Sequence, residues 1–126
     1  MILIDRNSRI LFYASYVDFR KSFDGLCGVI RNEMDTDPLD GTLFVFYNRR
    51  RDRIKILVWD TDGFWLHYKR LEQGTFEVPQ MRNGEDHITM SRVELELLLN
   101  GVVLGSVRWR KRYKRRKTKT FFNNKQ

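Results

Sequence analysis

The sequence NRRRDR at residues 48–53 places four arginines within five positions. They are Arg49, Arg50, Arg51 and Arg53. Neighbouring guanidinium groups repel one another unless an anion lies among them, and phosphate suits the planar guanidinium well. Arginine can also hold guanine through two hydrogen bonds, and a two-stranded ribbon fits the major groove of DNA. We therefore interpret this segment, with Lys55 beside it, as a nucleic-acid-binding site; the alternative is a solvated loop in which Asp52 pairs with one arginine.

A second basic segment lies at the end of the sequence. Residues 108–126 contain ten lysines and arginines and no acid, whereas residues 1–107 contain 14 basic and 16 acidic side chains. A cationic segment beside a nearly neutral domain is typical of an arm that binds a polyanion, although a solvated, disordered segment has the same composition. The candidate binding residues here are Arg108, Arg110, Lys111, Arg112, Lys114, Arg115, Arg116 and Lys117.

Arg20 and Lys21 form a third basic candidate. They are expected in the first turn of a helix, where the helix dipole disfavours cations. A bound phosphate would compensate, because free backbone N–H groups and two cations together make an anion site. Ion pairs with Asp18 or Asp24 would compensate equally well, so both interpretations stay open.

Trp65, His67 and Lys69 alternate along an expected strand and therefore share one of its faces. A surface that combines aromatic and basic side chains can stack bases and contact phosphates. Half-buried packing in the sheet explains Trp65 equally well.

Enzymatic chemistry has weaker candidates. The order and separation of Asp5, Asp60 and Glu96 are similar to those of the three metal-binding acids of retroviral-integrase-like transposases. In that fold the first acid lies in a long strand that continues into a hairpin, whereas Asp5 is nearly terminal and a helix precedes the hairpin here. His67, His87 and the one cysteine lack the spacing of a zinc site, and no nucleotide-binding or Ser–His–Asp motif is present. We therefore expect no enzymatic activity, no metal and no cofactor.

Apolar patterns predict the strands that would position these residues. Runs of β-branched and aromatic residues between turn signals predict five strands. Their ranges are 10–14, 43–48, 54–60, 64–71 and 75–79. The last four follow one another through short turns, so they are expected to form an antiparallel meander. The polar residues 80–89 are expected to form a loop.

Two helices are expected beside the strands. Apolar residues at helical spacing predict a helix at 19–34 with Asp18 as its N-cap, and close approach to a strand would explain Gly25 and Gly28 inside it. A second helix of about ten residues is predicted at 91–101, where a serine and a glutamate have the spacing of a capping box and the leucines that follow are expected in the core.

Together these elements predict a single α+β domain over residues 1–107, in which an antiparallel β-meander of about four to five strands packs with two helices. A basic, flexible tail at 108–126 follows. No apolar run approaches the roughly 18 residues of a membrane span, and the first apolar stretch is too short for a secretory signal. We therefore expect a cytoplasmic protein without a membrane partner.

Three long motifs resemble a known family. They are VDFRKSFDGL at 17–26, GTLFVFYNRRRDRIKILVWDTDGFWLHYKRLEQGTF at 41–76, and SRVELELLLNG at 91–101. These motifs are similar to the TnpB-type accessory protein, the second open reading frame, of insertion sequence family sixty-six. The resemblance covers nearly all of residues 1–117, with departures mainly at 80–89 and in the extension TKTFFNNKQ.

The resemblance implies participation in transposition beside a separate transposase that carries the catalytic acids, in the nucleoid-associated cytoplasm of a bacterium. Three kinds of partner stay open at this point. The protein could bind DNA at the element ends, dock on the transposase through the aromatic face of its sheet, or bind messenger RNA to limit transposase synthesis.

Overall fold

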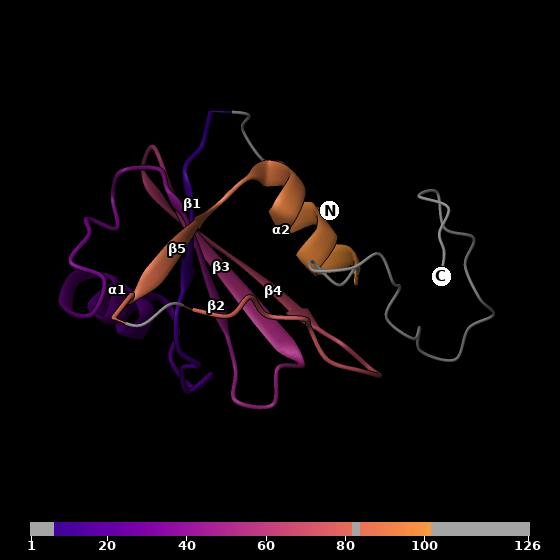
Figure 1. The fold of residues 1–126 in the computed structure, drawn as a ribbon. Coiled ribbons are helices and arrows are strands. Elements are labelled where there is room, and N and C mark those ends of the chain that lie inside the picture. Colours follow the sequence, from indigo (N-terminus) through magenta and orange to yellow (C-terminus); the bar gives the residue numbers. More distant parts are fainter. Residues whose placement is uncertain (1–6, 82–83, 102–126) are drawn as a thin grey trace.

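The computed structural model of the protein describes residues 7–81 and 84–101, and a five-stranded sheet forms its centre (Figure 1). The strand order is β4-β3-β2-β1-β5. The strands are β1 (Ile10–Tyr13), β2 (Leu43–Tyr47), β3 (Arg53–Asp60), β4 (Gly63–Arg70) and β5 (His87–Met90). β1 and β2 are parallel, and the other neighbouring pairs are antiparallel. The predicted α+β class is therefore confirmed, with a sheet that is mostly antiparallel.

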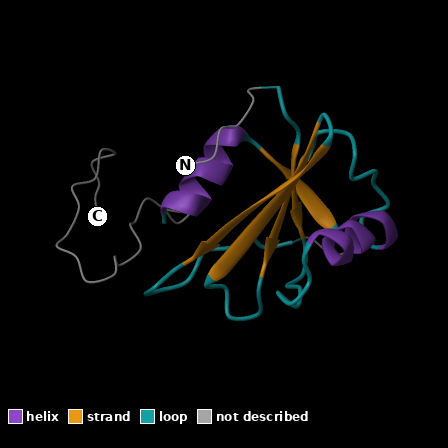
Figure 2. Cartoon of the chain, turned by 180° about the vertical axis from the view of Figure 1, so that it is seen from behind, coloured by secondary structure: helices purple, strands orange, loops and turns teal. Residues whose placement is uncertain are grey.

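Strand β2 lies in the middle of the sheet and is buried along its whole length. Its residues are apolar or aromatic without alternation, which is typical of a strand covered on both faces. Helix α1 (Phe23–Asn32) covers one face, where Leu26 and Ile30 pack with Phe44 and Phe46. Figures 1 and 2 show the second helix on the opposite side of the sheet.

Helix α2 (Arg92–Asn100) covers the other face and begins at the predicted capping box. The Ser91 hydroxyl accepts a hydrogen bond from the Glu94 amide at 3.0 Å, and the Glu94 carboxylate accepts one from the Ser91 amide at 2.8 Å. The helix ends at Gly101, whose left-handed backbone (φ 90°) is the usual helix terminator. Leu95 and Leu98 are fully buried, so their predicted place in the core is confirmed.

The fourth strand of the predicted meander, at 75–79, does not exist. After β4 the chain leaves the sheet, and the Phe76 amide donates to the carbonyl of Arg51 in the preceding hairpin instead of to β4. Phe76 is fully buried, and Leu71 and Val78 pack against the same core cluster as α2. Apolar alternation at 75–79 therefore reflects a segment that covers the sheet beside α2 without extending it.

The fifth strand lies where a loop was predicted. In β5, Ile88 pairs with Phe12 and Met90 pairs with Ile10, so both side chains point into the α2-side core. This edge strand has only four residues, and two of them, His87 and Thr89, are polar. Its apolar pattern is therefore too short to be distinguished from the polar residues before it.

The first helix is shorter than predicted. It spans residues 23–32 instead of 19–34, and Ser22 occupies the N-cap position that the sequence assigned to Asp18. Residues 18–21 form a turn, because the Asp18 carboxylate accepts from the Arg20 amide and the Asp18 carbonyl accepts from the Lys21 amide. Arg20 and Lys21 therefore precede the helix, outside its first turn.

Two predictions lie outside the described residues, namely the domain boundary at residue 107 and the basic tail at 108–126. Neither helix in the described part of the chain has the length and apolar character that a membrane span requires.

We expect Phe76→Ala to lower the free energy of unfolding by about 3–5 kcal/mol, because the substitution leaves a cavity under α2. Urea denaturation measures this change. Phe23→Ala is the matched control, since Phe23 is 42% exposed, and should change the free energy by less than about 1 kcal/mol. Equal losses in the two variants would contradict the packing described for residues 71–81.

Candidate nucleic-acid interface

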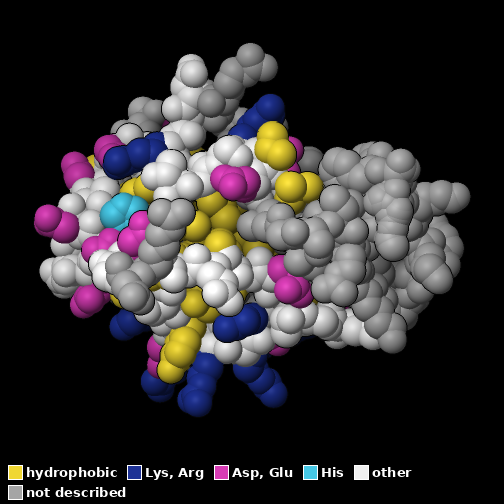
Figure 3. Space-filling view, in the orientation of Figure 1, with side chains coloured by type: hydrophobic (Ala, Val, Ile, Leu, Met, Phe, Trp, Pro, Cys, Tyr) yellow, Lys and Arg dark blue, Asp and Glu magenta, His cyan; other side chains and the backbone are white. Residues whose placement is uncertain are grey.

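Three connections gather at one end of the sheet. β1 and β2 run in the same direction and β3 returns, so the loop after β1 (14–22), the β2–β3 hairpin (48–52) and the turn after β4 (71–74) all lie at this end. We call it the hairpin end. Lys and Arg side chains project from the lower edge in Figure 3, where Figure 1 places the β2–β3 hairpin. The sheet thereby collects basic residues from separate parts of the sequence.

The hairpin loop is closed by the side chain of Asn48. Its Oδ1 accepts hydrogen bonds from the amides of Asp52 (3.1 Å) and Arg53 (3.0 Å). Its Nδ2 donates to the Asp52 carboxylate at 2.7 Å. An asparagine side chain that bonds backbone amides further along the chain fixes a turn. The loop that carries the arginines is therefore held in one conformation from within.

The segment after β4 holds the same loop from outside. The Leu71 amide donates to the Asp52 carbonyl (2.8 Å), and the Phe76 amide donates to the Arg51 carbonyl (2.7 Å). Arg51 has a left-handed backbone (φ 60°), a conformation that disfavours every residue with a Cβ by about 1–2 kcal/mol. The two hydrogen bonds from the segment after β4 hold this part of the hairpin in that conformation.

The four hairpin arginines have no acidic partner among the residues that the structure describes. The neighbouring carboxylate, Asp52, is engaged by Asn48 instead. The alternative in which Asp52 neutralises one arginine is therefore not what the structure contains. Arg49, Arg50 and Arg51 are exposed, so their positive charges face solvent at the hairpin end.

Two tyrosines that the sequence analysis did not single out flank this loop. Tyr16 is 53% exposed, and the Arg49 guanidinium carbon lies 5.9 Å from the centroid of its ring. Tyr68 is 50% exposed, and its hydroxyl accepts a hydrogen bond from Arg53 Nη1 at 2.9 Å. The β3–β4 register could have revealed Tyr68, which lies two positions from the residue opposite Arg53. Tyr16 lies in an irregular loop and has no comparable signal.

We name this set of residues the arginine–tyrosine surface. It consists of Tyr16, Arg49, Arg50, Arg51, Arg53 and Tyr68. It combines cations of the hairpin, which side-chain and backbone hydrogen bonds hold in place, with a half-exposed aromatic ring on each side of the hairpin. Phosphates and base faces are the chemical groups that such a surface can bind.

Lys55 does not lie on this surface, which corrects its assignment as a binding residue. Only 4% of it is exposed, and its ammonium donates to the carbonyls of Phe19 (2.9 Å) and Lys21 (2.6 Å). The ammonium also lies over the rings of Phe19 (4.8 Å) and Tyr68 (5.0 Å). Burial lowers the pKa of Lys55, and these carbonyls and rings stabilise its charge inside the protein. Lys55 therefore fastens the loop before α1 to the sheet.

Arg20 forms an ion pair with Asp18, which is one of the two interpretations that the sequence left open. Its Nε donates to both oxygens of the Asp18 carboxylate, at 3.1 and 3.0 Å. These bonds, followed by one from the Arg20 amide, lower the pKa of Asp18 to about 2. Neither Arg20 nor Lys21 lies in the first turn of α1, so the predicted anion site at the helix N-terminus is wrong.

Trp65, His67 and Lys69 share a face, as predicted, but it is the α2 face of the sheet. The Trp65 ring stacks on His67 with centroids 6.2 Å apart, and its indole N–H donates to Asp60. The Lys69 ammonium donates to the carbonyl of Leu99 in the last turn of α2. Burial lowers the pKa of His67, which favours its uncharged form. On this face Lys69 thus contacts the end of α2, whereas Trp65 remains 59% exposed.

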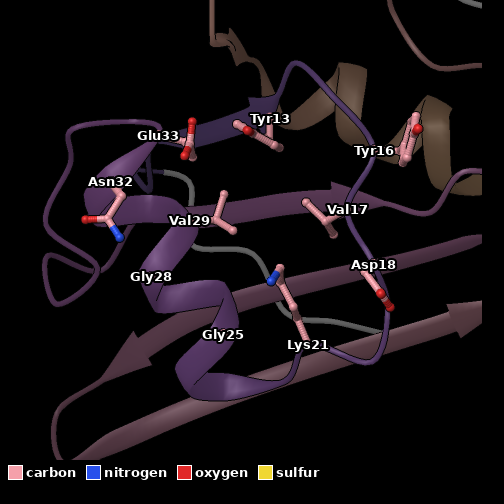
Figure 4. Close-up of a pocket in the computed structure, with 10 residues that line it drawn as sticks. All are labelled: Tyr13, Tyr16, Val17, Asp18, Lys21, Gly25, Gly28, Val29, Asn32 and Glu33. Atoms are coloured by element: carbon pink, nitrogen blue, oxygen red, sulfur yellow. The ribbon is translucent and has the colours of Figure 1, made fainter.

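A groove of about 430 Å³ runs between α1 and the loop after β1 (Figure 4). Gly25 and Gly28 line it, and a Cβ on Gly28 would meet nothing within 4 Å, so close approach to a strand does not explain this glycine. Tyr13 and Glu33 lie beside each other at one end. Burial and then the Glu33 charge raise the pKa of Tyr13. Tyr16 lines this groove and also belongs to the group of exposed side chains around the hairpin, but the carboxylates of Asp18 and Glu33 in the lining disfavour phosphate inside the groove.

Within residues 7–81 and 84–101, no three histidine, cysteine, aspartate or glutamate side chains gather in a way that could hold a metal ion. Asp60 accepts from Trp65, and Glu96 lies 4.0 Å from Arg92. Asp5, the first member of the transposase-like acid set, lies outside the described residues.

Comparison with known proteins identifies the family. Residues 8–109 match the family described as IS66 Orf2 like protein. The chain belongs to this family. The uncharacterized protein y4jC of Sinorhizobium fredii is 37% identical over 102 residues, which cover 81% of this chain and 86% of that protein. The uncharacterized protein y4hO of the same organism is 32% identical over 102 residues, which cover 81% and 87%. No solved structure matches the chain significantly.

The IS66 Orf2 like match contains the whole arginine–tyrosine surface, because it begins before Tyr16 and ends at residue 109. It includes only the first two residues of the basic segment that begins at Arg108. Membership confirms the resemblance that the three sequence motifs carried.

The ion pair of Arg20 predicts a pH dependence. Unfolded Asp18 binds its proton near pH 3.9, and folded Asp18 binds it near pH 2, so the contribution of the pair to stability is complete above about pH 4 and is lost as the pH falls toward 2. We expect the Asp18 carboxyl to titrate in NMR with a midpoint of about 2, and Arg20→Gln to raise that midpoint toward 3.8. Arg31→Gln is the control and should leave it unchanged. Identical midpoints in the wild type and in Arg20→Gln would rule out the pair in solution.

Proposed function

We propose that the protein assists transposition by binding nucleic acid through the arginine–tyrosine surface while a separate transposase performs the chemistry. Membership of the IS66 Orf2 like family supports the accessory role. The nucleic-acid contact is supported by one observation above all, which is the group of four hairpin arginines without an acidic partner among the described residues.

The rigidity of the hairpin supports the same proposal. A binding loop that is already ordered loses less conformational entropy when the ligand arrives. Asn48 and the amides of Leu71 and Phe76 order this loop in the free protein. The arginines are therefore presented to a ligand in advance, and their mutual repulsion is relieved when phosphates neutralise them.

DNA at the element ends is the ligand that we propose. The basic segment at 108–126 would add a second, sequence-independent contact with phosphates, and RNA would fit the same cations. The catalytic acids would belong to the transposase, since we propose no enzymatic role for this chain.

The first test compares two triple variants that each remove three positive charges. Arg49/Arg50/Arg51→Ala should weaken binding to terminal-repeat DNA in a mobility-shift assay at low salt. It should also make the dependence of log affinity on log salt shallower, by up to about 0.9 for each phosphate that the variant no longer neutralises. The control Arg9/Arg31/Arg92→Ala changes arginines outside the arginine–tyrosine surface, of which Arg9 and Arg92 adjoin the opposite end of the sheet and Arg31 lies on α1, and it should keep most of the affinity.

Equal losses in the two variants would mean that only net charge matters, and would remove the hairpin from the proposal. Undetectable binding of terminal-repeat DNA by the intact protein at low salt would remove the element ends as the ligand.

The transposase is a proposed partner in either case. α1 covers one face of the sheet, and α2 with residues 71–81 covers the other, so the aromatic core residues are buried and cannot serve for docking. A contact would therefore have to use the outer surfaces of the helices or the sheet edges β4 and β5. Co-purification with the transposase in the presence of nuclease tests this partner, and a complex that disappears when nucleic acid is digested would argue against direct contact.

A further inference from the structure

The two tyrosines of the arginine–tyrosine surface lie on opposite flanks of the hairpin. Tyr68 belongs to β4, on one side. Tyr16 belongs to the loop that continues β1 along the other side, because the Val17 amide donates to the Tyr47 carbonyl at 3.0 Å. Three strand spacings separate these positions, which is roughly 14 Å. Two separate bases of one strand could therefore reach the two rings, with the arginines between them.

Each ring is associated with one hairpin arginine and is nevertheless about half exposed. Arg49 lies over the Tyr16 ring at 5.9 Å, and Arg53 binds the hydroxyl of Tyr68 and not its ring face. Phe19 meets the Tyr68 ring at nearly a right angle, with centroids 5.8 Å apart, and the Lys55 ammonium lies 5.0 Å from its centroid. Tyr68 is thus supported from within the protein while half of its surface stays exposed.

Duplex DNA explains the arginines but not the rings. In a duplex the base faces are stacked on one another, so a protein surface meets phosphates and base edges. Tyrosine rings gain stacking energy from bases that are unpaired, and proteins that hold single strands combine such rings with cations that follow the backbone. The arginine–tyrosine surface has this combination of groups.

We infer that the arginine–tyrosine surface binds single-stranded nucleic acid, with Tyr16 and Tyr68 stacking on unpaired bases and the hairpin arginines contacting the phosphates between them. This inference rests on the proposed nucleic-acid binding and specifies the state of the strand. Single-stranded DNA and RNA present the same chemistry to this surface.

The test separates base contacts from phosphate contacts. Fluorescence anisotropy with the full chain measures binding to an oligothymidylate of about 20 nucleotides, to an abasic strand of the same length, to the matching duplex and to an oligouridylate. We expect the wild type to bind thymidylate about tenfold more tightly than the abasic strand, and Tyr16→Leu or Tyr68→Leu to reduce that preference severalfold. Tyr16→Phe and Tyr68→Phe keep the rings and should keep the preference. The uridylate arm shows whether the sugar matters.

Trp65→Leu is the matched control, because Trp65 is an equally exposed aromatic residue (59%) on the α2 side of the sheet. It should leave the preference for bases unchanged, and circular dichroism checks that every variant is folded.

If the wild type binds the thymidylate and abasic strands equally and Arg49/Arg50/Arg51→Ala abolishes both, the hairpin function stands and stacking on the tyrosines is wrong. Stacking is also wrong if the leucine variants weaken binding to both strands equally, since the rings then only orient the arginines. If no probe is bound, the proposed function itself is wrong.

Discussion

Strand β2 is buried on both faces, and a strand of this kind is stable only when both faces of the sheet are covered. The chain meets this requirement with α1 on one side and with α2 and residues 71–81 on the other. The second cover determines the site, because the segment that carries Phe76 into the core also donates the hydrogen bond that fixes Arg51 in the hairpin. The same segment therefore helps to bury the central strand and to order the hairpin.

Electrostatics then distinguish the hairpin from the other basic positions. Arg20 is paired with Asp18, Lys55 is enclosed by carbonyls and rings, and Lys69 binds the end of α2. The hairpin arginines have no such acidic partner within the described part of the chain, and two exposed tyrosines accompany them. A cluster of unneutralised guanidinium groups on an ordered loop is a surface suited to a polyanion.

Much of the fold could be predicted from sequence. The strong β patterns around Phe44 and Ile56 and the capping box at Ser91 are local signals that the structure confirms. The prediction for residues 75–79 was wrong because their alternation resembles a strand, while a tertiary hydrogen bond to Arg51 decides their path. β5 was missed because pairing with β1, and not its own sequence, makes it a strand.

The candidate site was also predictable only in part, because local sequence signals do not show tertiary contacts. The density of arginines identified the hairpin, but the sequence gave no information on which side chains are buried. Lys55 was therefore assigned to the surface, although it is buried and its ammonium binds the loop before α1. Tyr16 joins the site only through the path of the loop after β1, which no local pattern encodes. The start of α1 was predicted too early, at residue 19, because Phe19 continues the helical spacing of apolar residues. In the structure residues 18–21 form a turn whose carbonyls bind Lys55, and the helix begins at Phe23.

The central claim, that nucleic acid contacts the hairpin arginines directly, can be tested most directly by NMR of the arginine side-chain Nε–H groups during addition of oligothymidylate. We expect the signals of the four hairpin arginines to shift or broaden first, while those of Arg9, Arg31 and Arg92, which lie outside the arginine–tyrosine surface, stay in place. Unchanged hairpin signals in a complex that forms would contradict the central claim.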